Sequence, residues 1–97
     1  MNEFIFQRRT PVEIDRLIAE RIRRIRRRRK ISQQRLSEKS GVSLGSLKRF
    51  ERSGEISLIS LTKIAAALEI EGELERLFEE VPFQSIEEIV NEENQKA

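Results

Sequence analysis

The chain has 97 residues, enough for one compact domain, and contains neither Cys nor His. These absences exclude disulfides, zinc ribbons and the commonest proton shuttle, so we expect no enzymatic activity, no metal site and no cofactor. The net charge of +2 is unevenly distributed, because residues 1–54 carry 16 Lys and Arg against 6 Asp and Glu, whereas residues 55–97 carry 3 against 11. The first half therefore favours a polyanionic partner, and the acidic second half is expected to face away from it or toward another protein.

The first helix signal begins at Thr10. Thr10 and Glu13 have the spacing of a capping box, and Pro11 stands at the first helical position, where its missing N–H costs nothing. Apolar residues then recur at spacings of three and four, namely Ile14, Leu17, Ile18, Ile22 and Ile25. This periodicity predicts a helix to about Arg29 with one apolar stripe in the core. Residues 1–9, with the Phe4–Phe6 patch, are predicted to form an N-terminal arm.

Three further helices are predicted between residues 32 and 68. Ser32, Ser43 and Ser57 can each cap the first turn of one helix, and Gly41 and Gly54 can end the first two. Val42 and Leu47 are placed to form a hydrophobic staple at the start of the middle helix. The residues expected to face the core are Leu36, Leu47, Phe50, Leu58, Leu61, Ile64, Ala65 and Leu68.

The C-terminal part carries weaker helix signals. A fifth helix is expected from about Glu73 to Glu79, with Leu74, Leu77 and Phe78 as its apolar side, and Ser85 with Glu88 predicts a short sixth helix. Residues 91–97 are polar and are expected to fray. Strand signals are nearly absent. The sequence thus predicts an all-α bundle, with an arm at 1–9, a helical domain at 10–80 and an acidic, partly disordered extension at 81–97.

Residues 32–54 are predicted to form two short helices joined by a tight turn at residues 40–42. This is the helix-turn-helix plan, in which the second helix enters the major groove of duplex DNA. The domain at residues 10–80 is therefore predicted to bind DNA. The sequence resembles the XRE, or Cro-type, helix-turn-helix regulators over roughly residues 12–70. The matching residues are Ile22–Arg26, Ile31–Ser37, Gly41–Ser43, Leu47, Phe50–Glu51, Gly54 and Leu61–Leu68. The resemblance implies a compact five-helix, lambda-repressor-like bundle. Because no apolar run approaches the roughly 20 residues needed to span a bilayer, we expect a cytoplasmic protein, nucleoid-associated through its DNA binding.

The resemblance also implies roles for individual residues. The base-reading positions are Leu44, Gly45, Ser46, Lys48 and Arg49 in the second helix of the motif. Gln33 and Ser43 are expected to bind phosphates, and Arg26 with Glu51 is expected to form a buried structural pair. The chain departs from the family pattern at Ser37, Ile56 and Leu44–Gly45, and the last of these puts two residues without hydrogen-bonding side chains on the reading helix.

The basic run at residues 21–30 offers additional phosphate ligands. Arg23 and Arg27 turn away from the isoleucine stripe and are predicted phosphate ligands, although a merely solvated basic face is the alternative. Because aromatic residues are not interleaved with these arginines, duplex DNA is favoured over RNA.

Two functions remain open at this point. One is a repressor that binds a palindromic operator as a homodimer, through the apolar side of the fifth helix, residues 81–90 or the Phe4–Phe6 arm. The other is an antitoxin that also binds a toxin, because Leu77–Phe78, Pro82 and Ser85–Ile89 resemble the extension of HipB-like antitoxins, the partners of HipA-like kinases. A membrane-surface helix is disfavoured, since residues 14–25 are expected to fill the core.

Overall fold

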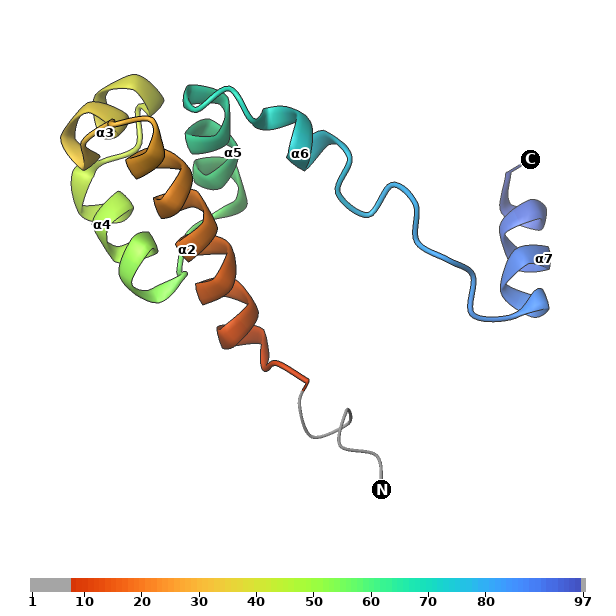
Figure 1. The fold of residues 1–97 in the computed structure, drawn as a ribbon. Helices are drawn as coiled ribbons and strands as arrows, with labels where there is room; N and C mark the ends of the chain where they lie inside the picture. The colour runs from red at the N-terminus through yellow and green to blue at the C-terminus, as the bar shows by residue number, and fades with distance from the viewer. Residues whose placement is uncertain (1–7, 97) are drawn as a thin grey trace.

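A computed structural model describes residues 8–96, so the predicted Phe4–Phe6 arm lies outside the described residues. The described residues form α2 (Pro11–Arg28), α3 (Gln33–Ser40), α4 (Leu44–Ser53), α5 (Leu58–Ala67), α6 (Glu71–Glu75) and α7 (Ile86–Gln95), as Figure 1 shows. Between residues 8 and 96 no strand occurs, which confirms the all-α prediction. None of the helices in this range is long and apolar enough to cross a bilayer.

The helices α2 to α5 enclose one small core. α2 packs against α4, α3 packs against both α4 and α5, and α6 follows on α5. Five large side chains are almost completely buried: Leu36, Leu47, Phe50, Ile64 and Leu68. Each contributes roughly 1.5–3 kcal/mol relative to an exposed side chain. Arg29, directly after α2, donates from its guanidinium to the carbonyl oxygen of Leu68 at the end of α5.

The predicted caps are all present. The side chains of Thr10, Ser32, Ser43 and Ser57 each accept the backbone N–H three residues on, which confirms the predicted starts of α2 to α5. Thr10 also donates its N–H to the Glu13 carboxylate at 2.8 Å. This hydrogen bond lowers the pKa of Glu13. At pH values above the ordinary pKa of a glutamate the charged cap therefore stabilises the folded protein, and this contribution is lost as the pH falls through the lowered pKa.

The predicted core is wrong at three apolar positions. Ile14, Ile18 and Leu58 keep 45%, 37% and 71% of their surface exposed. The end of α4 at Gly54 lies against the backbone of Asp15, so only the first turn of α2, which includes Ile14, extends past α4. Ile18 borders a hollow that Leu58 and Leu61 also line. α5 packs on α3 instead of covering this part of α2. The apolar stripe therefore faces the core only in its second half.

The C-terminal predictions also need correction. The fifth helix spans Glu71–Glu75 instead of about Glu73 to Glu79, because a right-handed helix cannot continue through the left-handed backbone conformation of Phe78. The chain then turns at Phe78, which has a φ of 63° and a largely exposed side chain. The predicted sixth helix is present as α7, and it continues to Gln95, past the point where fraying is expected.

α7 stands apart from the bundle. Figure 1 shows an extended connection from α6 to α7, and every residue from 75 to 96 is exposed. The radius of gyration is 17.5 Å, whereas a compact domain of about 100 residues has about 13 Å. α7 is thus a helix without tertiary support in a single chain.

The end of α4 depends on a glycine. Gly54 has a φ of +84°, and a Cβ at this position would lie 2.7 Å from the backbone carbon of Asp15. Gly41 has a similar φ of +76°, but a Cβ there would meet no atom within 4 Å. Only Gly54 is required both by the left-handed conformation and by a close approach of two helices.

We predict that Gly54→Ala destabilises the protein more than Gly41→Ala. The left-handed conformation alone costs about 1–2 kcal/mol in either variant. The collision with α2 adds roughly 1–3 kcal/mol at position 54. Denaturant unfolding of both variants measures the difference, and equal losses would show that α4 does not need this contact with α2.

Candidate nucleic-acid interface

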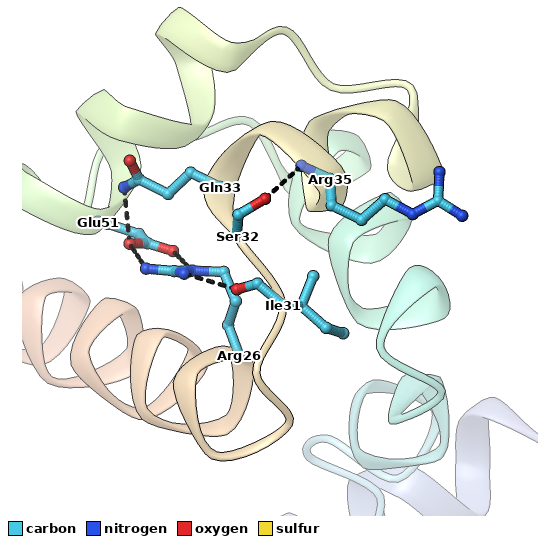
Figure 2. A network of polar contacts seen from close by, with 6 residues as sticks. All are labelled: Arg26, Ile31, Ser32, Gln33, Arg35 and Glu51. Carbon is cyan, nitrogen blue, oxygen red and sulfur yellow. Dashed lines mark hydrogen bonds and ion pairs between the residues drawn. The ribbon is translucent and has the colours of Figure 1, made fainter.

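A buried polar network joins the three helices around the predicted motif (Figure 2). Arg26 on α2 donates to both carboxylate oxygens of Glu51 on α4, from Nε at 2.7 Å and from Nη2 at 2.9 Å. Nη1 of Arg26 donates to the carbonyl oxygen of Ile31 at 2.8 Å. The Arg26 and Glu51 side chains are only 9% and 4% exposed. The two residues predicted as a structural pair therefore meet in a two-bond, desolvated geometry.

Gln33 is the third member of this network. Its Nε2 donates to Oε1 of Glu51 at 2.9 Å, so the first turn of α3 is tied to the last turn of α4. An amide nitrogen carries two hydrogens, and the second remains free to donate to a phosphate. Ser32 caps the same turn by accepting the N–H of Arg35 at 3.0 Å, as Figure 2 shows. The structure thus places Gln33 at the junction of α3 and α4.

The turn between α3 and α4 is also fixed by side chains. Ser37 donates its hydroxyl to the carbonyl oxygen of Val42 at 2.6 Å, and the Val42 N–H donates to the Ser40 hydroxyl at 3.1 Å. The Val42 side chain is buried in the core with Leu47. The serine at position 37, a departure from the family pattern, therefore acquires a structural hydrogen bond. Together these contacts hold α3 and α4 as one unit.

The exposed surface of α4 has two sides. On one side Lys48 and Arg52 share a shallow hollow with Gln33 and with Arg23 of α2, directly over the Arg26–Glu51 pair. On the other side Ser46 and Arg49 face Glu55 and the start of α5. The sequence analysis did not single out Arg52, although its position four residues after Lys48 puts both on one face of the helix. The predicted base-reading residues are therefore divided between the two sides.

Arg49 is bound by a carboxylate that the sequence analysis missed. Its Nη2 lies 3.2 Å from Oε1 of Glu55, and the two side chains are 61% and 64% exposed. An exposed ion pair of this kind is worth at most about 1 kcal/mol, so it can open when a stronger partner arrives. Glu55 follows Gly54, and no local pattern in the sequence indicates that the turn brings it back to Arg49.

The first turn of α4 is compact. The Ser43 hydroxyl accepts the Ser46 N–H at 3.1 Å and donates to the Ser46 hydroxyl at 2.9 Å. Leu44 is half-buried, whereas Gly45 is exposed, and a Cβ on Gly45 would meet no protein atom within 4 Å. The fold itself therefore does not require glycine at position 45.

The two predicted phosphate ligands on α2 differ in their position relative to α4. Arg23 and Arg27 are both exposed and border a basic surface that includes Arg24 and Arg28. Arg23 also borders the hollow beside Lys48, whereas Arg27 does not. The structure thus brings Arg23 next to α4 and places Arg27 farther along the basic surface.

We predict that Arg26→Ala strongly destabilises the protein. It would leave the Glu51 carboxylate buried without its cation, which costs about 3–5 kcal/mol in comparable pairs. Arg23→Ala and Arg27→Ala are matched controls on the same helix and should change stability by less than about 0.5 kcal/mol, since both side chains are exposed. Thermal and urea unfolding measure all three, and equal shifts would contradict a structural role confined to Arg26.

Comparison with known families identifies the motif. The family model described as Helix-turn-helix matches residues 22–74, from the middle of α2 into α6. This match covers more than half of the chain and includes the whole α3–α4 unit. Comparisons with curated proteins and with solved structures gave no significant match. The chain belongs to the XRE-type helix-turn-helix family of DNA-binding regulators.

Proposed function

We propose that the protein is a transcriptional repressor that binds a specific double-stranded operator with α4 in the major groove. The observation that supports this most is the Arg26–Glu51–Gln33 network, which fixes α4 relative to α2 and α3 while its outer surface stays exposed. A recognition helix needs this rigidity, because base contacts tolerate little displacement. A DNA-binding role also fits the cytoplasmic, nucleoid-associated localisation expected from the sequence.

In this proposal the two sides of α4 have different tasks. Arg23, Lys48 and Arg52 surround one hollow, so they form a cluster of cations suited to the phosphates on one edge of the groove. Gln33, at the start of α3, borders the same hollow and binds a phosphate at this edge, and Ser43 binds a phosphate at the start of α4. Arg27 extends the phosphate contacts along α2. Lys48, expected from the sequence to read bases, fits the phosphate cluster better.

Base reading falls to the other side and the first turn of α4. Arg49 donates to guanine O6 and N7, a pairing that discriminates by about 1–3 kcal/mol. Ser46 adds a hydroxyl, Leu44 contacts a thymine methyl group, and Gly45 lets the DNA approach the helix closely. An exposed glycine near the start of a helix lowers its stability, and no protein contact explains it here, so a close DNA contact gives this residue a purpose.

We further propose that the protein binds DNA as a homodimer. One recognition helix reads only a few base pairs, and two-fold pairing doubles the contacts on a palindromic site whose half-sites lie about 34–36 Å apart. Repression then follows from occupying a promoter.

The antitoxin role is the second candidate. It is favoured by the acidic C-terminal segment and by α7, whose apolar side chains have no partner in the single chain. A HipA-like kinase is the partner that the sequence resemblance implies. A neighbouring kinase gene would support this role, and its absence would favour the free-standing repressor.

We predict that Arg49→Ala and Arg27→Ala affect DNA binding in different ways. The test uses an operator selected from random duplexes by the wild-type protein, and a scrambled duplex as control. Arg27→Ala should weaken both duplexes about equally and flatten the slope of log affinity against log salt by about 0.9, because one phosphate contact is lost. Arg49→Ala should weaken the operator about 5- to 150-fold more than the scrambled duplex, since a guanine contact is lost.

Titrations at several salt concentrations separate the two effects. If Arg49→Ala lost the same factor on both duplexes, Arg49 would be a phosphate ligand. Base reading would then depend on residues 44–46, on Lys48 or on DNA shape.

We predict that Glu55→Gln increases affinity for the operator by a factor of about 2–5 and affinity for the scrambled duplex by less. The substitution releases Arg49 from an exposed ion pair and removes a negative charge beside the groove, an effect of up to about 1 kcal/mol. In an Arg49→Ala background the gain should shrink, because the released partner is missing. A loss of operator preference in Glu55→Gln would contradict this and would show that Glu55 itself accepts a hydrogen bond from cytosine.

A further inference from the structure

The helix α7 has an apolar side that nothing covers in the single chain. Ile86, Ile89 and Val90 share one face at spacings of three and four, and all three are exposed. Glu93 continues the same row toward the C-terminus. An isolated helix of ten residues is marginal in water even with its Ser85 cap, so α7 needs a surface to pack on.

The bundle has an exposed apolar surface on which the apolar side of α7 could pack. Ile18 of α2 and Leu58 and Leu61 of α5 line one hollow, which reaches down to Phe50. Ile14 lies one turn before Ile18 on α2 and is also exposed. These are the positions where the apolar stripe leaves the core, because α5 does not pack along this half of α2. We call this surface the α2–α5 groove.

Apolar and charged residues follow one another in a matching order along α2 and along α7. Along α2, Ile14 and Ile18 are followed by Arg21 on the same face, and along α7, Ile86 and Ile89 are followed by Glu93. Parallel packing of the two helices would align the apolar pairs and place Glu93 beside Arg21. Residues 79–95 carry six glutamates and no Lys or Arg. The first half of α2, which borders the groove, carries Glu13, Asp15 and Glu20 against Arg16, and the other arginines of α2 begin at Arg21. Attraction is therefore confined to the C-terminal end of α7, where the parallel arrangement brings Glu93 to Arg21.

We propose that α7 of one chain docks in the α2–α5 groove of a second copy, and that α7 of the second copy docks in the groove of the first. The structure supports a partner in trans because α7 lies away from its own bundle on an extended connection (Figure 1). A reciprocal exchange covers both apolar surfaces of both chains with one two-fold interface. None of the predicted DNA contacts lines the groove, although Ile56 borders both the groove and the hollow beside Arg49. This inference builds on the homodimer proposed above and names its interface.

Cysteine cross-linking of the full chain tests the exchange, because the natural sequence contains no Cys. Ile18→Cys and Ile89→Cys are made as single variants, mixed in equal amounts and oxidised, and the linked peptides are identified by mass spectrometry. The expected product is a disulfide between Cys at 18 of one chain and Cys at 89 of the other. Asn91→Cys, on the opposite side of α7, replaces Ile89→Cys in the control mixture and should cross-link several-fold less.

Two further measurements distinguish exchange between chains from folding back within one chain and from the absence of a dimer. One is oxidation of the double variant Ile18→Cys/Ile89→Cys, and the other is the mass of the protein in solution by light scattering. A covalent dimer with two interchain disulfides supports the exchange. A disulfide closed within one chain would overturn it and show that α7 folds back on its own groove. A dimeric mass without any 18–89 disulfide would overturn the docking but leave the proposed homodimer, with the groove open to another protein. A monomeric mass at high micromolar concentration, free and on DNA, would contradict both proposals.

Discussion

The ion pair between Arg26 and Glu51 is the interaction on which the geometry of the motif depends. Two desolvated hydrogen bonds join the last turn of α2 to the last turn of α4, and Gln33 extends the contact to α3. Burying two charges gives little net stability, but a buried charge can be satisfied only in one arrangement. The pair therefore selects one orientation of α3 and α4, and this orientation brings Lys48 and Arg52 close to Arg23.

The distribution of charge follows from that arrangement. Arginines that are not needed for the pair remain exposed along α2, and one of them, Arg23, lies beside the polar residues of α4. The acidic residues are concentrated after Gly54, in segments that form little of the core. Glu55 is the exception, because Gly54 turns the chain back and puts its carboxylate on Arg49. The basic face thus includes the Glu55 carboxylate, which competes with DNA for Arg49, the principal base-reading candidate.

Local features of the sequence predicted most of the fold. The caps at Thr10, Ser32, Ser43 and Ser57 were predictable because each depends on residues within one turn. Apolar periodicity predicted the face of α2 that turns inward, but it could not tell that no helix covers Ile14 and Ile18, since this depends on where α5 packs. The contact of Arg26 with Glu51 followed from family resemblance. The contact of Arg49 with Glu55 had no such guide, because it depends on how the chain leaves α4.

We propose that the α3–α4 unit forms the DNA-binding face. An NMR titration of ¹⁵N-labelled protein with a duplex selected from random sequences tests this directly. The largest changes in amide chemical shift should occur at the start of α3 and across residues 43–52, with smaller changes in the second half of α2. Changes concentrated in α5 and α7, or the absence of saturable changes with duplex DNA, would contradict the account.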